Sequence, residues 1–163
     1  MALPIGSLGS RACRCALLAA AMAAAAPGAT AAEYRTTGEA TVLYDAPSAK
    51  SKPLFVLGRD MPLEVIVPLE GWMKVRDAGG SIGWVDRKVL TDRRTLVVRV
   101  PIAEVFANPD VTAPLVFRAE QNVLLELAEP ATSAGTTATP GWVKVRHRDG
   151  QVGFVRIAQV FGL

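Results

Sequence analysis

The sequence predicts an all-β fold of two small β-barrels in tandem, preceded by a cleavable signal peptide. The first observation is an internal repeat: Gly71–Val85 reads GWMKVRDAGGSIGWV, and Gly141–Val155 reads GWVKVRHRDGQVGFV, 70 residues later. The second is a series of short alternating apolar and polar runs separated by turn-forming residues, which is typical of β-hairpins. The third is an alanine-rich apolar stretch near the N-terminus.

The N-terminal stretch has the layout of a secretory signal peptide. Two arginines precede an apolar run at Ala16–Ala26, which is too short to span a bilayer as an ordinary helix, and Pro27 ends it. The small residues that follow fit cleavage after Ala31 or Ala32. A buried alanine-rich helix is the alternative. We expect residues 1–32 to be removed, leaving no membrane anchor and a periplasmic protein, with secretion to the medium still open.

Loss of this leader changes the composition of the chain. Both cysteines, Cys13 and Cys15, lie ahead of the apolar run, so the mature chain would have neither a disulfide nor a thiol nucleophile. Its 131 residues would carry 16 basic and 15 acidic side chains. The whole-chain pI of about 9.1 therefore belongs mostly to the leader, and we expect no nucleic-acid partner.

The first barrel is predicted over residues 40–91. Residues 33–39 are polar and without periodicity, so we expect a flexible start. Beyond them, short strands alternate with turns rich in Pro, Ser, Gly and Asp, at the spacing of a small barrel. The expected elements are strands at 41–44, 54–57 and 63–67, the hairpin at 71–85, and a helical turn at 86–90.

The second barrel is predicted over residues 95–163 with the same plan. Residues 131–140 are small and polar, so we expect them to form an extended loop before the second hairpin. The joint at 91–94 is short, so we expect the barrels to lie close with restricted relative motion. The apolar run Leu96–Val100 either begins the second barrel or pairs with the first.

These motifs resemble the bacterial SH3-like (SH3b) domain family, in tandem. The resemblance rests on a strand with an aromatic residue three positions before Pro, then Gly-Trp-x-Lys-Val-Arg, then Gly-x-x-Gly-Trp/Phe-Val and a terminal helical turn, and it covers most of residues 40–163. It implies two small barrels of an exported protein that binds or targets rather than catalyses.

The first repeat also resembles eukaryotic SH3 domains at Leu43-Tyr44-Asp45 and Gly83-Trp84-Val85. In those domains a Pro and a Tyr in the final helical turn complete a groove for polyproline peptides. The corresponding turns here, residues 86–89 and 156–159, have neither residue. We therefore expect no polyproline binding.

The hairpins supply the candidate ligand-binding residues. Alternation places the branched residues of each first strand in the core and a tryptophan with two cations outside, where they suit a sugar or peptide bearing carboxylates. The alternative is that each tryptophan covers a small core and the cations only face solvent. Trp84 and Phe154 are expected in the core. The candidate residues are Trp72, Lys74, Arg76, Trp142, Lys144 and Arg146.

The residue inventory argues against catalysis. His147 is the only histidine and stands between Arg146 and Arg148, with no nucleophile nearby. We expect no metal, no cofactor and no enzymatic activity. Two functions remain: a module that binds peptidoglycan or another cell-wall component, or a periplasmic adaptor that binds a partner protein through the same surface or a strand edge.

Overall fold

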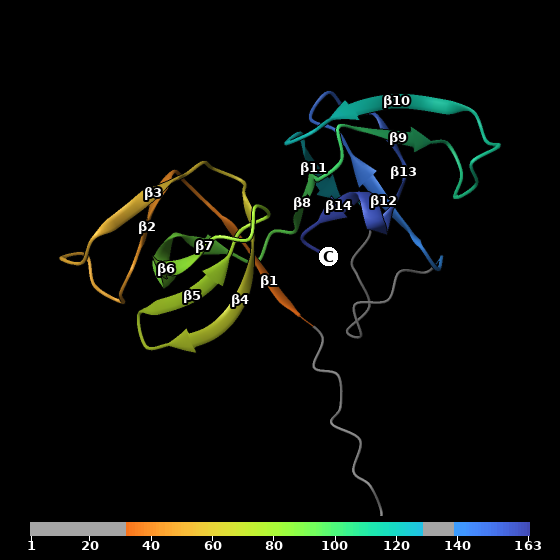
Figure 1. The fold of residues 1–163 in the computed structure, drawn as a ribbon. Coiled ribbons are helices and arrows are strands. Elements are labelled where there is room, and N and C mark those ends of the chain that lie inside the picture. The colour runs from red at the N-terminus through yellow and green to blue at the C-terminus, as the bar shows by residue number, and fades with distance from the viewer. Residues whose placement is uncertain (1–31, 129–138) are drawn as a thin grey trace, which may run out of the picture.

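The computed structural model describes residues 32–128 and 139–163 (Figure 1). The predicted signal peptide, residues 1–32, lies outside the described residues except for Ala32, and the predicted loop at 131–140 does so except for its last two residues. Across residues 32–128 and 139–163, no helix is long and apolar enough to cross a membrane.

The first sheet has seven antiparallel strands in the order β3-β2-β6-β5-β4-β1-β7. A short 3-10 turn, Arg87–Val89, connects β6 to β7 along the chain. The strands are β1 (Glu33–Thr37), β2 (Thr41–Tyr44), β3 (Pro53–Leu57), β4 (Pro62–Leu69), β5 (Trp72–Arg76), β6 (Ile82–Asp86) and β7 (Leu90–Thr91).

The second sheet repeats this order as β10-β9-β13-β12-β11-β8-β14, with a 3-10 turn at Ile157–Gln159. Its first strand settles the role of the apolar run at Leu96–Val100, because β8 pairs with β11 and β14 and so begins the second sheet. The strands are β8 (Thr95–Val98), β9 (Ile102–Phe106), β10 (Leu115–Glu120), β11 (Leu124–Leu127), β12 (Trp142–Arg146), β13 (Val152–Arg156) and β14 (Val160–Phe161).

The all-β fold class is confirmed, but neither sheet is a hydrogen-bonded closed barrel. Among the described residues, β3 and β7 are the unpaired ends of the first sheet, and β10 and β14 those of the second. The terminal strands β7 and β14 are two residues long and pair only with β1 and β8. Such short strands offer no second ladder to the opposite end, so each sheet stays open.

The prediction of a flexible start at residues 33–39 is wrong. Residues Glu33–Thr37 form β1, which pairs with both β4 and β7. The sequence hides this strand because its side chains are polar, yet Thr36 and Thr37 are fully buried. Their hydroxyls have partners: Thr37 Oγ1 donates to the Gly58 carbonyl at 2.7 Å and accepts from the Met61 amide at 2.8 Å. Hydrogen bonds to their hydroxyls therefore allow these polar side chains to be buried.

Each sheet folds around its own core of fully buried aliphatic residues. Burial of one such side chain stabilises the fold by about 1.5–3 kcal/mol. The first core contains Leu43, Leu57, Leu63, Met73, Val75 and Val85. The second is larger and contains Leu96, Val98, Ala103, Val105, Ala119, Leu125, Val143, Val145, Val155 and Val160.

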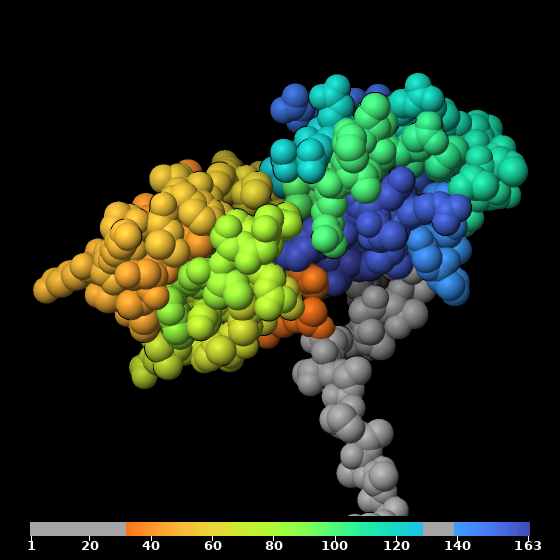
Figure 2. All heavy atoms as spheres, viewed as in Figure 1, coloured from red at the N-terminus to blue at the C-terminus, as the bar shows by residue number. Residues whose placement is uncertain are grey.

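The two sheets meet at a polar junction built from β1, β8 and the turn between β3 and β4. The hydroxyls of Thr36 and Thr95 lie 3.0 Å apart, and Thr95 Oγ1 donates to the Asp60 carbonyl at 2.8 Å. The Arg93 guanidinium pairs with the Asp60 carboxylate at 3.1 Å. Space-filling atoms show two lobes in direct contact across this line (Figure 2).

Aromatic and cationic side chains extend the same junction. The rings of Tyr34 and Phe161 meet edge to face with centroids 5.3 Å apart. Arg94 lies 5.8 Å from the Tyr34 ring centroid, and its guanidinium donates to the Gly162 carbonyl at 3.1 Å. Gly162 fits closely here, since a Cβ on it would come within 2.8 Å of the Pro62 side chain. These contacts from both lobes hold them against each other.

Candidate functional site

The hairpin of β5 and β6 presents opposite side chains to the two faces of the first sheet. Met73 and Val75 are buried in the core, while Trp72, Lys74 and Arg76 lie on the outer face and are half-buried. Alternation along β5 therefore places the predicted ligand-binding residues as the sequence indicated. On β12, Val143 and Val145 are likewise buried in the core, and Lys144 and Arg146 lie on the outer face, but Trp142 on that face is buried as well.

Three aromatic residues from separate strands, Tyr44, Trp72 and Trp84, gather on the outer face of the first sheet. The rings of Tyr44 and Trp72 meet edge to face with centroids 5.7 Å apart. Tyr44 is also the direct cross-strand partner of Trp84, and Lys74 is paired with Trp84 from the other side. The Lys74 ammonium lies 5.9 Å from the Trp84 ring centroid, within cation–π range.

Exposed aliphatic residues widen this surface. On β4, Val67 pairs with Lys74 and Leu69 pairs with Trp72, so both side chains lie on the outer face. They are 42% and 46% exposed. We call this surface the Trp72 face: Tyr44, Val67, Leu69, Trp72, Lys74 and Trp84.

An ion pair borders the Trp72 face. Arg76 donates from Nη1 to Glu64 Oε2 at 2.9 Å, and the two residues are direct cross-strand partners on β5 and β4. Arg76 was predicted as a cation for the ligand. The structure brings it to the outer face but gives it a carboxylate partner, so Lys74 is the cation nearest the aromatic rings.

The second sheet carries a related but closed surface. Phe106 and Trp142 meet edge to face at 5.9 Å between centroids, and Lys144 lies 5.8 Å from the Phe154 ring centroid. The Arg156 guanidinium stacks at 5.0 Å over the Trp142 ring, where the first sheet has Asp86 opposite Trp72. Trp142 is only 9% exposed. The two tryptophans are thus not equivalent.

The expected core positions of Trp84 and Phe154 are wrong. Each pairs with the outer-facing lysine of the neighbouring strand, so each ring lies on the outer face and is half-buried. The glycine before each aromatic is where the strand contacts the core: a Cβ on Gly83 would lie 2.6 Å from Leu43 Cγ.

Sequence reasoning missed three members of the Trp72 face: Tyr44, Val67 and Leu69. Tyr44 carried a signal, because it alternates with the buried Leu43 on β2 and must face outward. Val67 carried none. A β-bulge between Val65 and Val67 shifts the register of β4, and a run of apolar residues does not reveal which of them a bulge turns outward.

His147 lies in the β12–β13 turn and has two near neighbours. Its Nδ1 lies 3.0 Å from an Asp149 carboxylate oxygen, and its ring is tilted against Phe117 at 5.6 Å. The backbone amide of Gln151 donates to Asp149 and lowers the pKa of that carboxyl, and His147 lowers it further. In the described parts of the chain, no three His, Cys, Asp or Glu side chains gather as a metal site would require.

Comparisons with solved structures find distant similarity. Two proteins from Trichomonas vaginalis are similar: NlpC2, at 14% identity and a TM-score of 0.35 over 81% of this chain, and NlpC1, at 15% and 0.36 over 83%. An NlpC/P60 family protein from Bacillus cereus ATCC 10987 is 16% identical, with a TM-score of 0.36 over 79% of this chain. This chain covers 48%, 48% and 56% of those three proteins.

Sequence comparison gives one family match. No curated protein sequence matches the chain. Residues 37–92 match the family model of the bacterial SH3 domain, and this range contains every residue of the Trp72 face.

Proposed function

We propose that this chain is an exported, non-catalytic protein that binds peptidoglycan or another cell-wall component through the Trp72 face. The carrying observation is that the segment matching the bacterial SH3 domain also holds the open aromatic surface. The predicted leader at residues 1–32 supports export, with the periplasm as the expected compartment. We also propose that the second sheet, residues 95–163, is a second domain of this kind, since its strand order is the same.

The chemistry of the Trp72 face suits a glycan or a peptide. The edge-to-face arrangement of Tyr44 and Trp72 leaves aromatic surface on which a sugar ring can stack. Lys74 places a cation beside the rings for a carboxylate. Aliphatic neighbours Val67 and Leu69 extend the apolar surface, and exposed apolar surface of this kind marks binding sites.

The alternative is a periplasmic adaptor that binds a partner protein. It is favoured by β3, an end strand of the first sheet whose residues Leu54, Phe55 and Val56 are 41%, 39% and 67% exposed. An unpaired, apolar strand edge accepts a strand from another chain.

Sedimentation with purified, protein-free peptidoglycan tests the proposal and separates the two functions. Wall binding predicts that residues 33–163 sediment with the polymer when no other protein is present. If the chain stays in solution with peptidoglycan alone but sediments once periplasmic extract is added, the adaptor function is correct and wall binding is wrong.

A further inference from the structure

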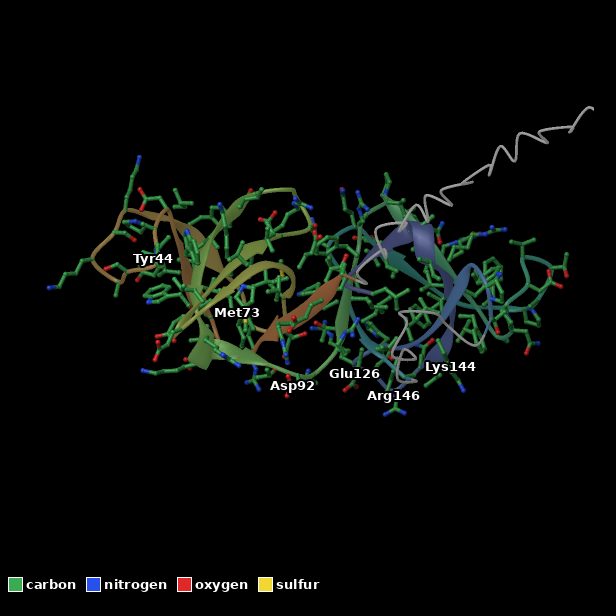
Figure 3. The ribbon with its side chains drawn as sticks, turned by 90° about the horizontal axis from the view of Figure 1, so that it is seen from below. Tyr44, Met73, Asp92, Glu126, Lys144 and Arg146 are labelled. Carbon is green, nitrogen blue, oxygen red and sulfur yellow. The ribbon has the colours of Figure 1, made fainter. Side chains whose placement is uncertain are left out.

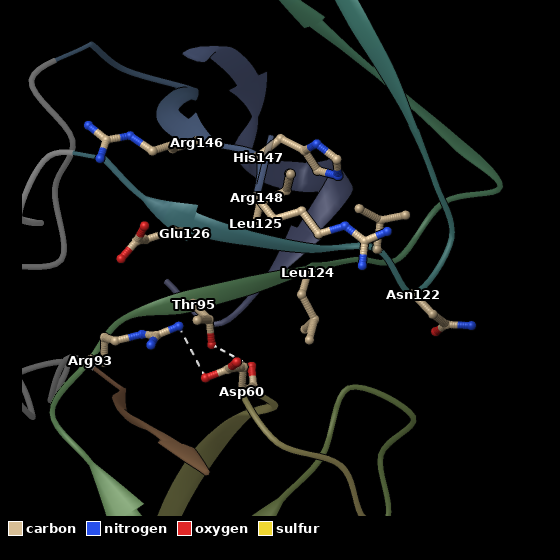
Figure 4. A pocket seen from close by; sticks show the side chains of 11 residues that line it. Asp60, Arg93, Thr95, Asn122, Leu124, Leu125, Glu126, Arg146, His147 and Arg148 are labelled. Carbon is tan, nitrogen blue, oxygen red and sulfur yellow. Dashed lines mark hydrogen bonds and ion pairs between the residues drawn. The ribbon is translucent and has the colours of Figure 1, made fainter. Parts of the chain in front are cut away.

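A pocket of about 440 Å³ lies where the second sheet meets the turn and linker of the first (Figure 4). That volume falls in the range of small-ligand sites. The second sheet supplies most of the wall, and Asp60 and Arg93 close one side. Its lining residues are Asp60, Arg93, Thr95, Asn122, Val123, Leu124, Leu125, Glu126, Arg146, His147 and Arg148.

Two guanidiniums in this pocket have no carboxylate partner in the described parts of the chain. Arg93 is paired with Asp60, but neither Arg146 nor Arg148 forms an ion pair within residues 32–128 and 139–163. Figure 4 shows the two side chains extending in opposite directions from the segment around His147, Arg146 above Glu126 and Arg148 toward Asn122. The positive charge available to a ligand therefore exceeds the negative charge of Glu126.

The first sheet has an ion pair at the position that corresponds to Glu126 and Arg146. There Glu64 and Arg76 are cross-strand partners and form an ion pair at 2.9 Å. The equivalent cross-strand partners in the second sheet are Glu126 and Arg146. Both line the pocket instead and form no ion pair among the described residues; Figure 3 labels the two side chains.

We propose that this pocket binds a short peptide through its free C-terminal carboxylate. Arg148, which extends toward Asn122, supplies the planar donor group for the carboxylate, and Arg146 adds positive charge at the other end of the pocket. Leu124 contributes apolar surface for a small aliphatic side chain, and the Asn122 side chain can bond a peptide group. Glu126 disfavours ligands with a second negative charge nearby. The site is separate from the Trp72 face and does not depend on wall binding.

The test is an NMR titration of the mature chain with N-acetyl-Ala-Leu-Ala and with its C-terminal amide. The acid form should shift the amide signals of residues 122–126 and 146–148 saturably, and the amide form should bind roughly tenfold more weakly because it lacks the charge. The double variant Arg146→Gln/Arg148→Gln, checked for an unchanged fold by its spectrum, should bind the acid form at least tenfold more weakly than the wild type does.

Arg118→Gln is the matched control. Arg118 on β10 forms an ion pair with Glu104 on β9 and does not line the pocket. Its affinity should be unchanged. Equal binding of acid and amide, undiminished binding by the double variant, or an absence of saturable shifts would overturn the proposal. So would inorganic phosphate competing as strongly as the peptide, since that identifies a general anion site.

Discussion

Thr36 donates a hydrogen bond to Thr95 across the junction of the two sheets. The two hydroxyl oxygens lie 3.0 Å apart, and the single proton of Thr95 is already given to the Asp60 carbonyl at 2.8 Å. The direction of the first bond follows from the second, because a hydroxyl donates only once. Both side chains are buried, so the lobes are joined by a short chain of three polar groups.

Thr95→Val should lower the free energy of unfolding by about 2 kcal/mol. The substitution keeps the volume but leaves the Thr36 hydroxyl and the Asp60 carbonyl without this partner. Urea unfolding monitored by tryptophan fluorescence measures the change. The double variant Thr36→Val/Thr95→Val should lose less free energy of unfolding than the two single variants lose together. Strict additivity of the two losses would show that the hydroxyls do not interact.

Tyr34 should make the junction sensitive to alkaline pH. Burial raises the pKa of the Tyr34 phenol above its ordinary value of 10.0, and the nearby Glu64 carboxylate raises it further. Below pH 10 the phenol is neutral in both folded and unfolded chains, so its contribution is fully present. As the pH rises from 10 through the folded pKa, the unfolded chain ionises first and stability falls.

Tyr34→Phe should therefore lose less stability than the wild type between pH 8 and pH 11. The phenylalanine keeps the edge-to-face contact with Phe161 but has no proton to lose. Urea midpoints at the two pH values provide the measurement. Equal losses in both proteins would mean that other groups set the alkaline limit.

The two tryptophans should respond differently to truncation. Trp142 is buried beneath Arg156, so Trp142→Ala should cost about 3 kcal/mol of folding stability. Trp72 is half-buried, and Trp72→Ala should cost about 1 kcal/mol. Thermal and urea unfolding of both variants check this. A larger loss for Trp72→Ala would reverse the assignment of open and closed faces.

Two glycines of the first hairpin should tolerate alanine to different degrees. Gly71 has a φ of +75° with nothing within 4 Å of an added Cβ, so Gly71→Ala should cost about 1 kcal/mol of backbone strain. At Gly83 an added Cβ would lie 2.7 Å from the Tyr44 carbonyl oxygen, which the sheet holds in place. Gly83→Ala should cost about 3 kcal/mol. Equal losses in denaturant titrations would contradict the close approach of β2 and β6.

Much of the fold could be predicted because the aliphatic residues alternate. The first strands of the two hairpins put their branched residues inside, and the glycine-containing turns fixed the register. β1 could not be predicted, because Thr36 and Thr37 are buried by hydrogen bonding rather than by apolar contact. Hydropathy does not distinguish such a strand from an exposed segment.

The candidate site could be predicted only in part. The hairpin alternation located Trp72, Lys74 and Arg76 on the outer face. The repeat also predicted equal roles for the two tryptophans, but the two rings differ in exposure and in the residue that faces them. Asp86 faces Trp72, whereas Arg156 stacks on Trp142. Cation stacking depends on side-chain conformation, which a strand pattern does not contain.

The most direct test of wall binding is sedimentation of Trp72→Ala with purified peptidoglycan, beside the wild type and an Ile102→Ala control. Ile102 is 56% exposed on the second sheet and lies outside the Trp72 face. We predict that the wild type and the control sediment equally, while folded Trp72→Ala stays largely in solution. Equal sedimentation of all three proteins would contradict binding through the Trp72 face.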